Sequence, residues 1–210
     1  MMVFRSAVAD WNYVPSSSMN PTLIAGDRVV VNKLAYSLRV PFTLVEIARW
    51  DRPHPGDVVT FDSPLDEVNL IKRVVAVEGD VIAMHQNQLT INGKVIERTL
   101  LDARRVIPSE AGDLLAEIWR ESLGDTKIDV ARLPAMNRFT EFGPVQVPSG
   151  HMLVLGDSRD NSNDSRFIGF IDMRRVTGRA IRVALSHDPA SMYLPRAGRW
   201  WLPLHAGNRS

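Results

Sequence analysis

Asn69-Leu-Ile-Lys-Arg-Val-Val-Ala-Val77 is a nine-residue run whose aliphatic and β-branched side chains predict a strand. Successive side chains of a strand point to opposite faces, so Lys72 shares a face with Leu70 and Val74. An amine among apolar side chains loses solvation, which lowers its pKa and allows it to act as a general base. The alternative is that Lys72 extends along the apolar surface and keeps its amine in water. Arg73 cannot act as a base, and we assign it to an ion pair.

Short runs of the same kind occur on both sides of this segment. Asp27-Arg-Val-Val-Val-Asn-Lys33 alternates well enough for a strand, and Asn92-Gly93 is the dipeptide most typical of a two-residue hairpin turn. We expect further strands over residues 57–61, 81–84, 89–91, 95–99, 145–147, 152–155 and 179–185. The sequence therefore predicts a mainly β protein.

Residues 85–145 differ from their flanks because they are more polar and contain a candidate helix between Ser109, which can cap it, and Gly124, which can end it. The apolar residues that recur there at intervals of three and four are Leu114, Leu115, Ile118, Trp119 and Leu123. A short helix is also expected within 35–50. We therefore predict a discontinuous β-rich core (1–84 and 146–188), a smaller inserted α+β subdomain (85–145) and a C-terminal tail (189–210).

The tail places Trp200 and Trp201 beside Arg196 and Arg199. It is either a strand or coil that covers the core, or an aromatic and basic surface for a membrane interface.

The composition excludes several classes of protein. The 210 residues include 25 Lys and Arg against 24 Asp and Glu, and a net charge of +1 gives no general attraction for nucleic acid. The absence of cysteine excludes a disulfide scaffold, a thiolate zinc site and a cysteine nucleophile. No run of five apolar residues occurs, so the sequence predicts neither a membrane-spanning helix nor the core of a signal peptide. The five histidines have no metal-binding spacing, and we expect no cofactor.

Val14-Pro-Ser-Ser-Ser-Met-Asn-Pro-Thr22, here called the serine segment, precedes the strand that begins at Asp27. Its two prolines fix φ and remove backbone donors, so the segment is rigid and not helical. Rigidly placed hydroxyl groups suit a nucleophile. A serine-rich loop without a chemical role is the alternative.

Gly156-Asp-Ser-Arg-Asp-Asn-Ser-Asn-Asp-Ser-Arg-Phe-Ile-Gly169, here called the charged loop, follows an apolar strand. Its charges nearly balance, which favours ion pairing within the loop. A calcium site formed by Asp157, Asp160 and Asp164 is the alternative, but the spacing is not that of an EF-hand and no bidentate glutamate closes it. We therefore predict no metal site.

Four segments, in this order, resemble the conserved boxes of type I signal peptidases. They are Pro15-Ser-Ser-Ser-Met-Asn-Pro-Thr-Leu23, Gly26-Asp-Arg-Val-Val-Val-Asn-Lys33, Ile71-Lys-Arg-Val-Val-Ala-Val-Glu-Gly-Asp80 and Gly156-Asp-Ser-Arg-Asp-Asn-Ser-Asn-Asp-Ser-Arg166. Each box alone is moderately specific, whereas four in the right order across most of the chain are highly specific.

The resemblance implies a Ser/Lys-dyad serine endopeptidase. Such an enzyme removes signal peptides from exported pre-proteins after small residues at −1 and −3, through an acyl-enzyme. On the matching positions, Ser18 is the expected nucleophile and Lys72 the general base. Ser16 is expected to supply the side-chain donor of the oxyanion hole, and Ser162 to orient the lysine amine.

The resemblance also implies supporting residues and a fold, namely a β-rich core with a smaller inserted region. The ion-paired scaffold behind the dyad is expected to comprise Asp157, Arg159, Asp164 and Arg166. The pockets for the small substrate residues are expected to be lined by Val14, Met19, Leu23, Val29, Leu70 and Ile71.

Three positions depart from the family pattern. Ser158 stands where asparagine is more frequent, and Ser17 stands where glycine often occurs. The third departure is at the N-terminus: the family usually has one or two anchoring helices ahead of the serine, whereas seventeen residues precede Ser18 here. We therefore expect no transmembrane helix in the chain. We expect it to associate with the membrane, with its catalytic part on the outer (periplasmic or extracytoplasmic) face of the inner or plasma membrane. Its expected partners are the signal peptides of pre-proteins and the membrane surface, with no nucleic acid.

Two other functions remain open. The self-cleaving repressors share the dyad, but they carry a DNA-binding domain and a cleavage site ahead of the serine, whereas Ala111-Gly112 lies after it. The other is a catalytically inactive β-rich adaptor that contacts a membrane surface through Trp200 and Trp201. Because both dyad residues are present, the sequence favours the peptidase.

Overall fold

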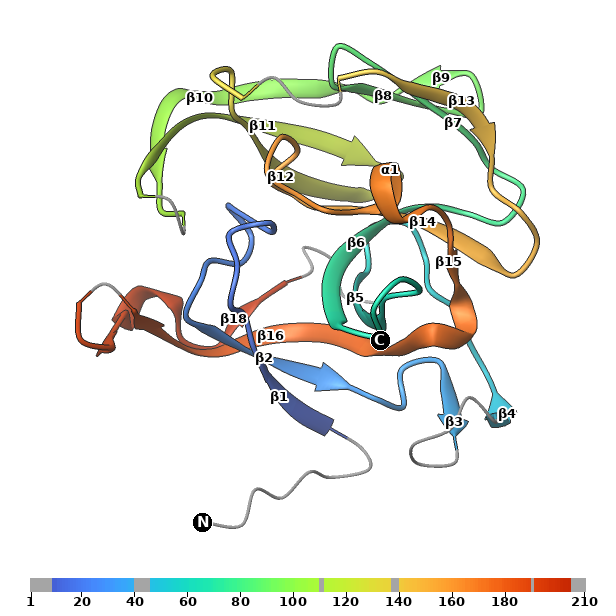
Figure 1. Ribbon diagram of the computed structural model, residues 1–210, viewed down its shortest axis with the longest axis horizontal. Coiled ribbons are helices and arrows are strands. Elements are labelled where there is room, and N and C mark those ends of the chain that lie inside the picture. The colour runs from blue at the N-terminus through green and yellow to red at the C-terminus, as the bar shows by residue number, and fades with distance from the viewer. Residues whose placement is uncertain (1–8, 40–45, 110–111, 137–139, 190, 205–210) are drawn as a thin grey trace.

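The computed structural model describes residues 9–39, 46–109, 112–136, 140–189 and 191–204. Its largest sheet has nine antiparallel strands (Figure 1). Their order is β1 (Ala9–Tyr13), β2 (Asp27–Asn32), β16 (Val176–Asp188), β5 (Val58–Asp62), β6 (Asn69–Val77), β14 (His151–Leu155) and β15 (Ile171–Asp172), with β17 (Leu194–Pro195) and β18 (Leu202–Pro203) beside β16. Strand β16, which comes late in the sequence, therefore lies between two pairs of strands. On one side are β1 and β2, which flank the serine segment, and on the other are β5 and β6, of which β6 carries Lys72.

Two smaller sheets lie above the large sheet in the view of Figure 1. One contains β10 (Arg98–Ile107), β11 (Leu114–Leu123) and β12 (Thr126–Arg132), and is here called the inserted sheet. The other contains β13 (Phe142–Gln146), β7 (Val81–His85), β8 (Gln88–Ile91) and β9 (Lys94–Val95), while β3 (Ser37–Arg39) pairs with β4 (Glu46–Arg49). The predicted subdomain boundaries stay a prediction.

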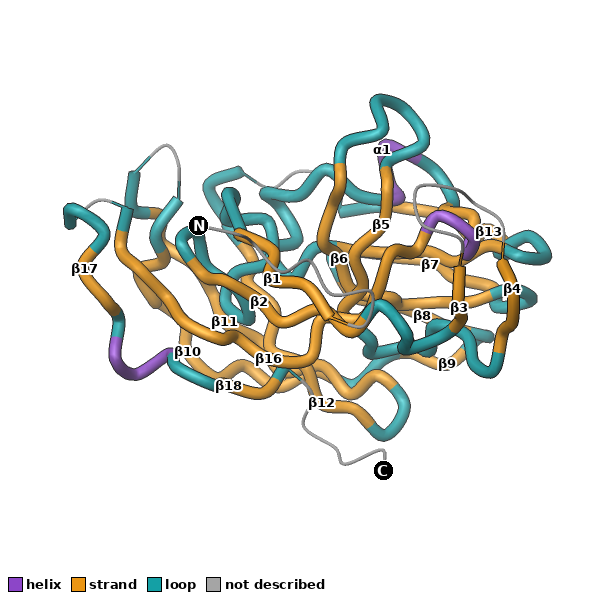
Figure 2. Tube along the Cα trace, turned by 90° about the horizontal axis from the view of Figure 1, so that it is seen from below, coloured by secondary structure: helices purple, strands orange, loops and turns teal. Residues whose placement is uncertain are grey.

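Helices are few and short among the described residues. They are α1 (Ser165–Ile168), η1 (Met173–Arg175) and η2 (Ala197–Arg199), and Figure 2 shows how small their share of the chain is. The prediction of a mainly β fold is confirmed. The helix expected within 35–50 falls partly on residues 40–45, outside the described residues, and its flanks form β3 and β4.

The helix predicted between Ser109 and Gly124 is wrong, because the apolar residues on which it was based lie in strand β11, which pairs with β10 and β12. One face of β11 buries Ile118 against one apolar cluster, and the other buries Leu123 against a second. The buried face therefore changes along the strand, and its apolar and polar residues do not alternate throughout. Its apolar residues can therefore fall by chance at helical intervals.

The hairpin predicted at Asn92-Gly93 is confirmed. Ile91 pairs with Lys94, and both turn residues have positive φ, 51° and 75°, as a two-residue hairpin turn requires. The run predicted as one strand over 95–99 is divided between β9 and β10. The other predicted strands each overlap an observed one.

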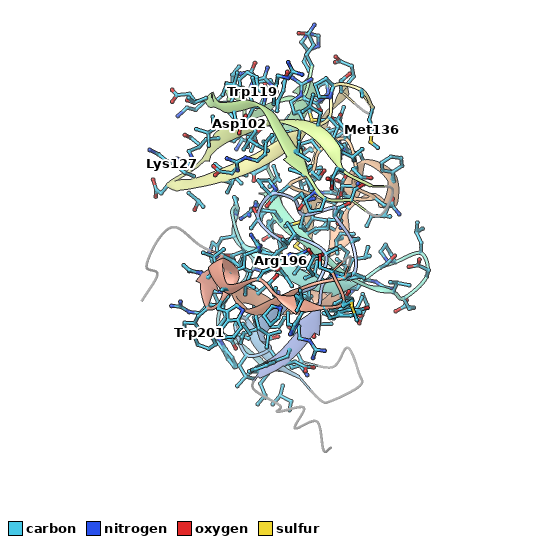
Figure 3. All side chains as sticks on the ribbon, turned by 90° about the vertical axis from the view of Figure 1, so that its left-hand side faces the viewer. Asp102, Trp119, Lys127, Met136, Arg196 and Trp201 are labelled. Atoms are coloured by element: carbon cyan, nitrogen blue, oxygen red, sulfur yellow. The ribbon has the colours of Figure 1, made fainter. Side chains whose placement is uncertain are left out.

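An apolar cluster beneath the serine segment fixes its position in the fold. The cluster includes Val14, Met19 and Leu23, all buried, and draws further members from β2, β5 and β16. Leu204 of the tail joins it, so the tail does cover the core, while Trp200 and Trp201 stay more than half exposed. Figure 3 shows Trp119 of the inserted sheet near the top of the molecule, Trp201 in its lower part and Arg196 between them.

Candidate active site

The serine segment turns sharply between β1 and β2. The amide of Asn20 donates to the Ser17 carbonyl at 3.0 Å, and the amide of Leu23 donates to the Met19 carbonyl at 2.9 Å. Burying Met19 and Leu23 contributes about 1.5–3 kcal/mol for each side chain. Ser18 lies within the first of these turns and is 8% exposed.

Lys72 reaches the same point from β6. Its side chain is buried, and Nζ lies 2.8 Å from Ser18 Oγ and 3.0 Å from the carbonyl oxygen of Ile71. Burial lowers the pKa of Lys72 from its ordinary value of 10.5 to about 8, although the negative charges of Asp164 and Asp157 act in the opposite direction. The structure thus brings a hydroxyl group and a readily deprotonated amine into contact.

The other two predicted serines differ in their placement. Ser16 Oγ lies 3.2 Å from Ser18 Oγ. Ser162 Oγ is buried and has no hydrogen-bond partner among the described residues, so the structure does not join it to Lys72. It lies against Gly156, where an added Cβ would come within 2.2 Å of Ser162 Oγ and 2.5 Å of the Ser18 carbonyl oxygen. Only glycine allows the charged loop to approach the serine segment this closely.

The charged loop is held by buried ion pairs, of which only one is internal. Arg166 and Asp164 pair within the loop at 2.8 Å. Asp157 instead accepts two hydrogen bonds from Arg73, at 2.8 and 2.7 Å, which confirms the ion pair predicted for Arg73. Arg159 pairs with Glu121 of the inserted sheet. The loop therefore joins the core to the insertion.

Asp160 is also engaged, because its Oδ2 accepts a hydrogen bond from the Leu133 amide at 2.8 Å. Within the part of the chain that the structure describes, no group of three or more His, Asp and Glu residues could hold a metal ion.

A groove of about 480 Å³ extends from Val14 between β1 and β6. Of the residues predicted to line substrate pockets, Val14, Val29, Leu70 and Ile71 line it. Met19 and Leu23 do not line the groove, although they belong to the same apolar cluster as Val14 and Val29.

The groove has a polar part that the sequence did not single out. It is lined by Asp10, Asn12, Lys33, Thr60, Asn69 and Thr177. Asn12 lies two residues before Val14, and Asn69 two residues before Ile71. Extending the two-residue period of a strand from the predicted pocket residues would have found both.

Comparison with known proteins identifies the family of the chain. The sequence model of the family described as "Signal peptidase, peptidase S26" matches residues 1–185. The chain belongs to this family. It is therefore a serine peptidase, a hydrolase of the kind that cleaves signal peptides, and the expected family and enzyme class are confirmed.

Relatives of this signal peptidase family member include two from Pseudomonas. The Signal peptidase I of Pseudomonas fluorescens is 35% identical over 212 residues, which cover 95% of this chain and 73% of the relative. That of Pseudomonas aeruginosa is 32% identical over 213 residues, with the same coverage. A crystal structure of a signal peptidase I from Enterococcus faecalis V583 is 23% identical with a TM-score of 0.39, covering 61% of this chain and 97% of that one. This likeness is too weak to add to the assignment.

No helix among the described residues has the length and apolar character needed to cross a membrane.

Proposed function

We propose that the chain cleaves N-terminal signal peptides from exported pre-proteins, after small residues at −1 and −3, with Ser18 and Lys72 as its dyad. The contact of 2.8 Å between Lys72 Nζ and Ser18 Oγ carries the proposal. It is supported by a lysine pKa of about 8, because roughly a tenth of the amine is then neutral at pH 7. A neutral amine can accept the serine proton, which an ammonium group cannot.

The first chemical step forms the acyl-enzyme. Lys72 Nζ takes the proton from Ser18 Oγ, and the oxygen attacks the scissile carbonyl carbon. The negative charge on the carbonyl oxygen is stabilised by the Ser16 hydroxyl and the backbone N–H of Ser18. Such a donor typically contributes about 10²–10³ in rate. The Lys72 ammonium then gives its proton to the leaving amine as the peptide bond breaks.

The second step releases the signal peptide. Lys72, neutral again, takes a proton from water as the water attacks the acyl carbon, and the proton returns to Ser18 as the ester bond breaks. We assign to Ser162 the orientation of the lysine amine, since its buried hydroxyl has no other partner among the described residues. Asp157, Arg159, Asp164 and Arg166 hold the charged loop in place.

The groove supports the proposed cleavage specificity. Val14, Val29, Leu70 and Ile71 form an apolar lining beside the dyad, which suits short apolar side chains. The two walls of the groove come from strands, so an extended substrate can lie between them as an additional strand.

The exposed tryptophans of the tail support action at a membrane surface. Trp200 and Trp201 are 57% and 59% exposed, and indole rings concentrate at membrane–water interfaces. We propose that the chain works there, with its active site on the outer face of the membrane.

Two substitutions test the dyad. Ser18→Ala and Lys72→Ala should each abolish cleavage of a pre-protein carrying Ala-X-Ala, while Lys127→Ala, an exposed lysine of the inserted sheet, should retain full activity. A serine-directed acylating inhibitor should label the wild type at Ser18. Near-wild-type cleavage by either dyad variant would exclude the dyad, and failure of the wild type to cleave or react would favour an inactive adaptor.

A further inference from the structure

Glu121 is a buried carboxylate for which the proposed mechanism has no use. It lies on β11, between Trp119 and Leu123 on the face that packs against an apolar cluster. Its side chain is 4% exposed. Burying a carboxylate in apolar surroundings costs free energy unless the charge is paired.

The partner of Glu121 is Arg159 of the charged loop. Arg159 Nη1 donates to Oε1 at 3.0 Å and Nη2 donates to Oε2 at 2.5 Å, so the pair is bidentate. The Arg159 side chain is 1% exposed. A fork of two parallel hydrogen bonds fixes both the distance and the orientation of the two groups. The loop is therefore held in one position relative to β11.

Backbone contacts join the same part of the loop to β12. The Ala131 amide donates to the Asp157 carbonyl at 2.8 Å, and the Arg159 amide donates to the Ala131 carbonyl at 2.9 Å. Ala131 and Ser158 form a parallel bridge. Residues 157–159 thus lie beside β12 through one parallel bridge, and the Arg159 side chain joins them to β11.

The residues on either side of Arg159 contact the serine segment. The Ser158 amide donates to the Ser18 carbonyl at 3.1 Å, and Asn161 Nδ2 donates to Ser17 Oγ at 2.9 Å. A displacement of Arg159 would therefore be passed to the backbone of the nucleophile.

We propose that Glu121 is a positioning residue for the dyad, acting through Arg159 to set where the charged loop meets Ser18. The inference rests on the proposed function of the dyad. A second contact supports it, because Asn20 Nδ2 donates to the Pro108 carbonyl, just after β10, at 2.8 Å. The inserted sheet therefore holds both segments that surround the nucleophile.

A merely stabilising role would have different consequences. A buried ion pair can often be replaced by apolar residues of similar size without loss of stability. Such a replacement removes the bidentate fork that sets the loop position. A variant with both Glu121 and Arg159 replaced by apolar residues should then keep the stability of wild type but lose catalytic rate.

The experiment compares Glu121→Gln, the double variant Glu121→Leu/Arg159→Met and wild type. Asp129→Asn is the matched control, because it removes a carboxylate from the exposed Arg120–Asp129 pair of the same sheet. Each is assayed for kcat, KM and the pH dependence of kcat/KM on a pre-protein carrying Ala-X-Ala, with thermal unfolding measured alongside. Lys72→Ala in the same assay tests the dyad separately.

We expect kcat to fall about 10- to 100-fold in the folded variants, with KM within about threefold, since displacement of reacting groups by an ångström has effects of this size. The pH midpoint should move upward, because a displaced loop admits water to Lys72 and raises its pKa. The control should match wild type.

Wild-type kcat and an unchanged pH midpoint in either folded variant would overturn the inference, provided that Lys72→Ala is inactive. Activity in Lys72→Ala would instead refute the dyad. If Glu121→Gln does not fold, the double variant decides. If neither variant folds, the pair is a folding determinant and the inference is overturned.

Discussion

The serine segment and the charged loop meet at the dyad, but they are held in place by different forces. The serine segment is fixed by apolar burial, with its Met19 and the adjoining Leu23 fully inside a cluster. The charged loop is fixed by buried arginine–carboxylate pairs, among them Arg73–Asp157 at 2.7 Å. Apolar burial restricts the position of the backbone, whereas bidentate ion pairs fix both its position and its orientation.

This difference matters for how each region responds to a change. A cavity in apolar packing can be partly filled by relaxation of its neighbours. An unpaired buried charge cannot relax in this way, because it lacks both solvent and partner. The charged loop should therefore be the more sensitive of the two regions.

The largest expected effect comes from breaking the Arg73–Asp157 pair. Asp157→Ala leaves the Arg73 guanidinium buried without a carboxylate and should lower the free energy of unfolding by about 3–5 kcal/mol, measured by urea denaturation. Asp102→Ala, which removes the exposed Asp102–Arg105 pair, should cost less than about 1 kcal/mol. Adding Arg73→Met to Asp157→Ala should restore part of the loss. Equal small effects in both variants would contradict the comparison.

A smaller effect should follow when the apolar cluster beneath the serine segment loses volume. Leu23→Ala creates a cavity in the cluster and should cost about 2–4 kcal/mol, while Leu23→Met should retain most of the stability. Leu65→Ala, at a side chain that is 72% exposed, is the control and should change stability by less than about 0.5 kcal/mol. A loss for Leu23→Ala that exceeds that of Asp157→Ala would reverse the proposed order.

The pH dependence of activity gives the smallest effect and tests the contact between the two regions. With a Lys72 pKa of about 8, the neutral amine increases as the pH rises through 8, so kcat/KM should increase about fivefold between pH 7 and 8 and level off above 9. The measurement is kcat/KM on an Ala-X-Ala substrate from pH 6 to 10. A flat profile, or a midpoint near the ordinary lysine value of 10.5, would exclude a desolvated Lys72 as the base.

Much of this organisation could be predicted from local sequence. Strand β6, the Asn92-Gly93 hairpin and the juxtaposition of Ser18 with Lys72 all depend on residues within one short run or on a recognisable family pattern. The strand β11 could not be recognised, because its buried face changes along the strand and this interrupts the alternation on which strand prediction depends.

The ion-pair partner of Arg159 could not be predicted either. Glu121 lies 38 residues away in the sequence, inside a segment predicted as a helix, where a glutamate is an ordinary surface residue. Long-range pairs have no signature in a single sequence. Their detection requires the topology that brings the inserted sheet to the charged loop.

The place of β16 has a consequence for the order in which activity can arise during synthesis. Ser18 lies between β1 and β2 and Lys72 on β6, and β16 is the strand that joins these two parts of the sheet. Both dyad residues leave the ribosome long before residue 176. Until β16 has been made and inserted, the nascent chain contains a serine and a lysine that no sheet holds together. We therefore expect the proposed dyad to form, and signal-peptide cleavage to begin, only after β16 has joined the sheet.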